Sequence, residues 1–144
     1  MESKPEPPGP DAVEVRRCVD KILASRAFAN ARRVQQFLAF VVEETLAGRG
    51  HAINEPLVAA RVFNLADGFD RSRNSIVRAG ATHLRRRLRN YYAGEGRADP
   101  VVIELPAHGY APAIRVIRPN TYSLAAVRRL MAALGAAIRS TRSQ

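Results

Sequence analysis

The sequence has one cysteine, no tryptophan and only two lysines among its 144 residues. A single thiol, Cys18, excludes a disulfide framework and any site built from several thiolates. The three histidines (His51, His83 and His108) lack metal-ligand spacing, so we expect no metal site. The sequence also has no window of about 18 apolar residues and no apolar stretch near its start. We therefore expect a cytoplasmic protein without a secretion signal or a membrane span.

Negative charge is also scarce. Asp plus Glu number 13 against 23 Lys plus Arg, which gives a formal net charge of +10. An excess of this size favours an anionic partner, either nucleic acid or an anionic membrane surface. Apolar residues make up 47% of the chain, which is enough to form a core, and the length favours one domain.

Apolar spacing predicts an α+β fold that is mainly α, with one small β-hairpin. The expected helices span about residues 12–25, 31–47, 54–63, 75–92 and 122–139. Asp11 and Asn30 are candidate N-caps of the first two helices, and Asn74 or Ser75 of the fourth. A turn signal between two β-branched stretches predicts a hairpin over residues 101–117. In it, Gly109 is expected to take a positive φ, and Pro112 is expected to make the second strand an edge strand or to form a bulge.

Composition divides the chain into three parts. Residues 1–10 are rich in proline and are expected to form a disordered tail. Residues 11–118 are expected to fold as one domain, and residues 119–144 carry the amphipathic helix at 122–139. That helix is a candidate either for homodimerisation or for packing on its own domain, and the sequence leaves both open.

The expected helix at 75–92 has the most regular pattern. One face is apolar and is expected to be buried, with Val77, Ala81, Leu84, Leu88 and Tyr91. The opposite stripe is cationic and contains Arg78, Thr82, Arg85 and Arg89, with Arg86 beside it. Such a helix can enter the major groove of B-DNA, where arginine pairs with guanine O6 and N7 or binds phosphates.

Three helices, a basic helix and a hairpin follow one another in the order of a winged helix-turn-helix. In this interpretation Arg71 and Arg73 clamp phosphates before the basic helix, and the hairpin near His108 and Arg115 is the wing. The expected DNA-binding residues are Arg71, Arg73, Arg78, Thr82, Arg85, Arg86, Arg89, His108 and Arg115. Structural roles are favoured for Cys18, as a buried thiol, and for Tyr91 and Tyr92, as packing at the helix end.

Two segments carry a family resemblance. Residues 77–88, VRAGATHLRRRL, and 101–110, VVIELPAHGY, resemble the recognition helix and wing of OmpR/PhoB-type winged-helix domains. Over residues 12–118 the chain is more closely similar to a proteobacterial winged-helix-like domain that often precedes tetratricopeptide repeats and is commonly mislabelled adenylate cyclase. The matching positions include Phe28, Arg33, Phe37, Leu38, Val41, Val42, Glu43, Leu46, Gly48, Val62, Phe63, Phe69, Asp70, Ile76, Val77, Arg78, Leu84, Arg85, Leu88, Tyr91, Tyr92, Asp99, Pro100, Val101, Ile103, Leu105, Pro106, Gly109, Tyr110 and Pro112.

The resemblance implies a winged-helix fold used in transcriptional control, without cyclase activity. The chain departs from the pattern at Asn74 and Ser75, where an acidic residue is usual, and at Ala79 and Gly80, where a bulkier pair is usual. Gly80 costs a helix about 1 kcal/mol relative to Ala. It is expected either to permit a close approach to the second helix or to DNA, or only to loosen the helix.

These observations predict a sequence-specific double-stranded DNA-binding transcriptional regulator, associated with the nucleoid. Two alternatives stay open. An adaptor would present the arginine face to an acidic protein such as an RNA polymerase subunit, and a peripheral membrane protein would use residues 122–139. The second alternative is disfavoured, so no membrane partner is expected. Because the sequence has no nucleophile–base–acid arrangement and no glycine-rich phosphate loop, we expect neither enzymatic activity nor a cofactor.

Overall fold

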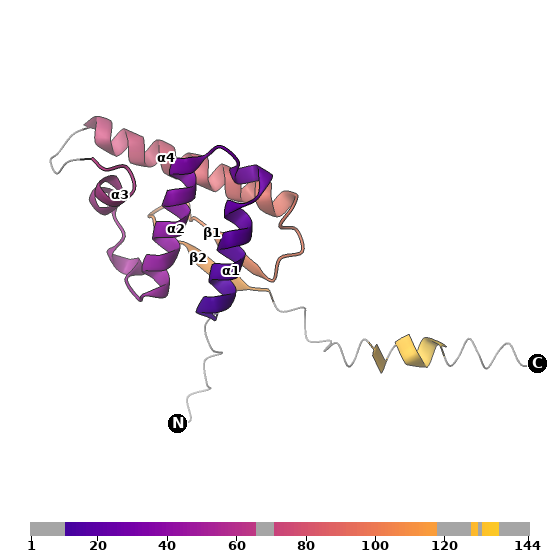
Figure 1. The fold of residues 1–144 in the computed structure, drawn as a ribbon. Helices are drawn as coiled ribbons and strands as arrows, with labels where there is room; N and C mark the ends of the chain where they lie inside the picture. The colour runs from indigo at the N-terminus through magenta and orange to yellow at the C-terminus, as the bar shows by residue number, and fades with distance from the viewer. Residues whose placement is uncertain (1–10, 66–70, 118–127, 130, 136–144) are drawn as a thin grey trace, which may run out of the picture.

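The computed structural model describes residues 11–65, 71–117, 128–129 and 131–135, with only the backbone at 71–73 (Figure 1). Over these ranges the chain is mainly helical with one two-stranded antiparallel sheet, which confirms the expected class. The elements are α1 (Ala12–Leu23), η1 (Arg26–Phe28), α2 (Arg32–Leu46), η2 (Gly50–Ala52), α3 (Glu55–Arg61), α4 (Arg71–Ala93), β1 (Val101–Glu104) and β2 (Ala113–Val116). Both η elements are short 3₁₀ helices. The predicted tail at 1–10 and most of the predicted helix at 122–139 lie outside the described residues.

The predicted starts of α1 and α3 are confirmed, whereas the caps predicted for α2 and α4 are not. Asp11 caps α1 by accepting a hydrogen bond from the Val13 backbone N–H, and Asn54 caps α3 in the same way. Asn30, in contrast, does not cap α2, because its backbone is left-handed at φ 58° and the N-cap is Ala31. Asparagine tolerates this conformation better than most residues, so Asn30 instead turns the chain between η1 and α2.

The core forms where α4 crosses the other elements. Helix α4 packs against α2, α3, η1 and β1, and Figure 1 shows it crossing over α2, with α3 beside its N-terminal part. The predicted apolar face of α4 is confirmed, because each of its five residues is at most 3% exposed. Each fully buried aliphatic side chain contributes about 1.5–3 kcal/mol through removal of apolar surface from water. This burial fixes which face of α4 remains exposed.

The glycine in the middle of α4 permits close packing of an aromatic ring. A Cβ atom at Gly80 would lie 2.7 Å from Cζ of Phe63, closer than real Cβ contacts, and 3.5 Å from the Phe37 ring of α2. The two rings meet edge to face, with centroids 6.0 Å apart. Of the expected roles for Gly80, close approach within the protein is therefore the one that the packing supports.

Helix α4 begins earlier than the sequence predicted. It starts at Arg71, so Asn74 and Ser75 lie inside the helix and do not cap it. Asn and Ser cost a helix interior less than about 1 kcal/mol each, so their presence does not force a helix to start there. The placement of Arg71 and Arg73 before the helix was therefore wrong. Both belong to its first turns, and their side chains lie outside the described part of the structure.

The hairpin is shorter than predicted and its turn is longer. Strand β1 pairs with β2 in the register Val101↔Val116 and Ile103↔Ile114, and Val101 and Ile103 are buried. The segment 105–112 connects the strands, and Gly109 has the predicted positive φ, at 85°. Pro112 precedes β2 and lies outside the ladder, and β2 is an edge strand of the two-stranded sheet, which is one of the two expected outcomes.

Candidate nucleic-acid interface

The exposed face of α4 is strongly cationic. The helix contains no Asp or Glu, and its arginines are Arg71, Arg73, Arg78, Arg85, Arg86, Arg87 and Arg89. Of the predicted DNA-binding residues on this helix, Arg78, Thr82, Arg86 and Arg89 are exposed and Arg85 is half-buried. The predicted stripe is therefore present, but its members make different contacts.

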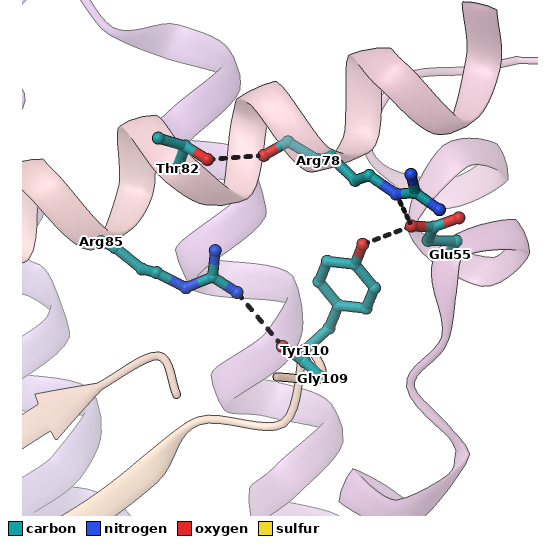
Figure 2. Close-up of polar contacts among 6 residues, drawn as sticks. All are labelled: Glu55, Arg78, Thr82, Arg85, Gly109 and Tyr110. Atoms are coloured by element: carbon teal, nitrogen blue, oxygen red, sulfur yellow. Dashed lines mark hydrogen bonds and ion pairs between the residues drawn. The ribbon is translucent and has the colours of Figure 1, made fainter. Parts of the chain in front are cut away.

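Arg78 is the arginine of α4 that pairs with a carboxylate among the described side chains. Its Nε donates to Oε1 of Glu55, the first residue of α3, at 2.8 Å, and the Tyr110 hydroxyl donates to the same oxygen at 2.7 Å (Figure 2). These donors hold the pKa of the Glu55 carboxyl below its usual value, Arg78 more strongly than Tyr110. Burial and the bond to Glu55 raise the pKa of Tyr110 to about 12.

Arg85 fastens the hairpin turn to α4. Its Nε donates to the Pro106 carbonyl at 2.9 Å, and Nη2 lies 3.5 Å from the Gly109 carbonyl (Figure 2). The Thr82 hydroxyl is also engaged, because it donates to the Arg78 carbonyl one turn earlier at 3.0 Å. Both residues were predicted as DNA contacts, but each already has an internal partner.

The three consecutive arginines of α4 point in three directions, because successive helical residues are about 100° apart. Arg85 faces the turn, as described. Nη2 of Arg86 lies 2.8 Å from Nδ1 of the exposed His83, and Arg87 donates to the Ala27 carbonyl of η1 at 2.8 Å. One turn further, Arg89 is exposed and makes no hydrogen bond or ion pair with the described residues. Among the arginine side chains of α4 that the structure describes, Arg86 and Arg89 are thus the best placed to meet an outside anion.

The two residues predicted for the wing also differ in their contacts. His108 is exposed in the turn, whereas Arg115 of β2 forms an ion pair with Glu104 of β1 at 2.8 Å. That pair is 61% and 57% exposed at its two side chains, so it contributes only about 0–1 kcal/mol. The pairing of Arg115 runs against its assignment as a free cation of the wing.

Two hollows lie on the side of α4 that faces the hairpin and its turn. The smaller, of about 360 Å³, lies between α4 and the turn and brings together Arg78, Thr82, Arg85 and His108. The larger, of about 540 Å³, lies between α4 and the hairpin. It is lined by Arg85, Arg89 and apolar side chains that include Leu88, Tyr92, Val102 and Leu105. The structure thus brings four of the nine predicted residues around one groove and places Arg89 at its neighbour.

Sequence reasoning missed Glu55 and Tyr110 as members of this site. Tyr110 was predicted only as a position of the family resemblance, and no role was predicted for Glu55, the first residue of α3. Glu55 is 23 residues from Arg78 and 55 from Tyr110, and no local pattern joins them. Charge complementarity between Glu55 and the acid-free helix was the one available signal.

The opposite end of α4 is closed by tyrosines, as predicted. The buried Tyr91 donates its hydroxyl to Asp99, whose other oxygen accepts from Lys21 Nζ at 2.7 Å. The Tyr92 hydroxyl donates to the Val101 carbonyl and accepts from the Ile103 N–H. Burial raises the pKa of Tyr91, and it raises that of Tyr92 to about 12. These phenols are therefore packing and hydrogen-bonding groups, not a platform for stacking bases.

No known protein family, curated protein or solved structure matches the chain. Across the described ranges, no three His, Cys, Asp or Glu side chains come together in a group that could hold a metal ion. Among the same residues, no helix is both long and apolar enough to cross a membrane.

Proposed function

We propose that the chain is a sequence-specific double-stranded DNA-binding protein of the winged-helix type that regulates transcription. Helix α4 would lie in the major groove, and the hairpin would contact phosphates or the adjacent minor groove. The observation that carries the proposal is the two-sided character of α4. One face is sealed in the core, and the other exposes arginines along a helix that contains no acidic residue.

The arrangement around α4 supports this reading. Helix α3 packs against α4, α2 lies against the same helix, and the hairpin follows directly. Because Arg85 fastens the turn at Pro106 and Gly109, the turn lies on the same side as Arg78. A helix of about 10–12 Å diameter fits the B-DNA major groove, which is about 12 Å wide. The turn would then meet the neighbouring backbone.

The contacts rank the candidate residues. Arg86 and Arg89 are the strongest, since both are exposed and neither pairs with a carboxylate. Arg78 follows: its pair with Glu55 uses Nε, and 71% of its side chain is exposed. His108 is a candidate phosphate contact, whereas Arg85 is assigned to holding the turn. Exposed ion pairs contribute about 0–1 kcal/mol, so Arg115 would exchange its pair with Glu104 for a phosphate at little cost.

Selection from a randomised duplex library, followed by binding at several salt concentrations, tests the proposal. We expect the selected duplex to bind more tightly than a scrambled duplex of the same composition, with log K falling linearly against log[salt]. The double variant Arg86→Ala/Arg89→Ala should weaken binding. Losses equal on both duplexes, with a slope smaller by about one unit per residue, would indicate phosphate contacts.

The matched control is Arg17→Ala/Arg97→Ala, which removes two exposed arginines that lie off α4. It should leave the preference for the selected duplex unchanged. The proposal is wrong if no duplex is enriched, or if the α4 and control variants lose affinity to the same extent.

A homodimer is part of the proposal, because one helix and one hairpin cover a small footprint on DNA. The described residues 128–129 and 131–135 are helical, and Met131 and Leu134, one turn apart, are 66% and 53% exposed. Sedimentation of the full chain and of Met131→Lys/Leu134→Lys decides this point. We expect a dimer that the double variant dissociates, and a wild-type monomer would remove the dimer from the proposal.

A protein-interaction adaptor is the second candidate. The observation that favours it is the larger groove, which is lined by apolar side chains together with Arg85 and Arg89. Such a surface suits an acidic peptide with apolar side chains. Duplex binding that is weak, salt-labile and independent of sequence would favour the adaptor over the regulator.

A further inference from the structure

A carboxylate lies at the edge of the proposed DNA-binding face, where a negative charge opposes the approach of a polyanion. The side chain of Glu55 is 20% exposed, and the Arg78 side chain that it holds is 71% exposed. The guanidinium is thus the outer partner and the carboxylate the inner one. Since electrostatics alone would disfavour Glu55 at this position for binding DNA, its contacts point to another role.

The contact with Glu55 uses only one N–H group of Arg78. Glu55 accepts from Nε, and no carboxylate of the described residues pairs with the terminal Nη1 and Nη2, although the Tyr110 hydroxyl also interacts with the guanidinium. Bidentate contacts of arginine with guanine or phosphate use such paired N–H groups. A long side chain held at Nε has also already lost much of the rotamer freedom that ordering would cost on binding.

The same oxygen of Glu55 also holds the hairpin turn. The Tyr110 hydroxyl donates to Oε1, and the Tyr110 ring packs against Phe37 of α2 with centroids 6.3 Å apart. One oxygen on α3 therefore connects Arg78 on α4 with the turn after β1. The two contacts of Glu55, together with the Arg85 contacts described above, therefore hold the turn at a fixed distance from the exposed face of α4.

We propose that Glu55 is a positioning residue that sets sequence discrimination rather than overall affinity. It holds Arg78 and the turn in the geometry that one duplex sequence matches. This proposal rests on the proposed function and adds a specificity-determining residue to it. Because it attributes discrimination to a carboxylate, it predicts that replacing Glu55 changes the affinity for specific DNA and the affinity for non-specific DNA in opposite directions.

Glu55→Ala and Glu55→Gln are compared on the selected and the scrambled duplex. For Glu55→Ala we expect the affinity for the scrambled duplex to rise, because a negative charge is lost, and the affinity for the selected duplex to fall. The ratio of the two affinities should drop about tenfold, the range typical of one lost bidentate contact. Glu55→Gln removes the same charge but keeps an acceptor oxygen for both donors, so it should recover most of the ratio.

Glu44→Ala is the matched control. Glu44 accepts from Nε of Arg49 at 2.9 Å and is 18% exposed, and neither residue belongs to α4 or the hairpin. Its substitution should leave the affinity ratio unchanged.

Four results would overturn the proposal. An equal rise on both duplexes would reduce Glu55 to a repulsive charge. An equal fall, with a lower midpoint of thermal unfolding, would make its role only structural. No change would remove any role. A wild-type chain that prefers no duplex would reject the proposed function itself, and this result is seen before any Glu55 variant is measured.

Discussion

The two ends of α4 are held in different ways. At the C-terminal end, the buried Tyr91 and Asp99 are hydrogen-bonded to each other, and Lys21 of α1 completes the group. In the N-terminal half, the corresponding polar contact is the outward-facing pair of Arg78 and Glu55. A buried hydrogen-bonding group left without its partner costs about 1–3 kcal/mol, whereas an exposed pair contributes about 0–1 kcal/mol. The comparison assigns the larger share of stability to the buried contact at the C-terminal end.

The largest expected effect comes from Asp99→Ala, which removes the hydrogen bonds of Tyr91 and Lys21 at the C-terminal end of α4. It leaves the Tyr91 hydroxyl buried without an acceptor, so the free energy of unfolding should fall by about 2–3 kcal/mol. Urea unfolding measures the change. Asp20→Ala, an exposed carboxylate on α1, is the control and should stay within about 0.5 kcal/mol of wild type. Equal losses in the two variants would refute the assignment.

Gly96→Ala tests the same end through packing. A Cβ atom there would lie 2.1 Å from Cε1 and 2.5 Å from Cδ1 of the buried Tyr91 ring, so ring or backbone must move. We expect a loss of about 1–2 kcal/mol in unfolding free energy. At Gly94 the nearest neighbour of an added Cβ is the Asn90 carbonyl at 3.5 Å, an ordinary contact. Gly94→Ala should therefore be close to neutral in the same unfolding assay.

Arg86→Ala and Arg87→Ala test whether two adjacent residues of α4 contribute separately, one to duplex binding and the other to stability. Arg87→Ala removes the bond to the Ala27 carbonyl and should cost about 1 kcal/mol of stability, with duplex affinity unchanged. Arg86→Ala should do the reverse and weaken duplex binding while the unfolding midpoint stays fixed. Thermal unfolding and duplex titration are measured on both variants. Similar effects of the two substitutions would contradict the division.

The smallest expected effect is the pH dependence of the pair at Glu55. Its pKa in the folded chain lies below the unfolded value of about 4.3, so the stabilisation is present above that pH and is lost as pH falls through the folded pKa. The stability difference between wild type and Glu55→Gln should be at most about 1 kcal/mol near neutral pH and should vanish in acid. Thermal unfolding across this range measures it, and a difference independent of pH would show that the charge is not involved.

Local patterns predicted much of the fold. The buried face of α4 followed from apolar residues at steps of three and four, and the hairpin followed from β-branched residues around a turn. The start of α4 did not, because Asn74 and Ser75 resemble caps but are also tolerated inside a helix. Nor could Asn30 be distinguished from a cap, since the same residue type favours a left-handed turn.

The site was predictable in composition but not in detail. Sequence alone located the arginines on one helix and expected His108 in the turn. It could not assign Arg85 to the turn carbonyls, Arg78 to Glu55, or Arg115 to Glu104. Each of these pairs joins residues on different elements, so only the packing of those elements decides which guanidiniums remain available.

Cys18 offers a built-in measure of how the domain opens. Its thiol is 5% exposed on α1, which packs against β1, and burial raises its pKa, so the reactive thiolate is scarce in the closed state. Since the chain has no other cysteine, the mass added by a small alkylating reagent reports the separation of α1 from the sheet without any engineered label. Labelling rates measured with and without duplex would then show whether a duplex bound at α4 slows the separation of α1 from β1.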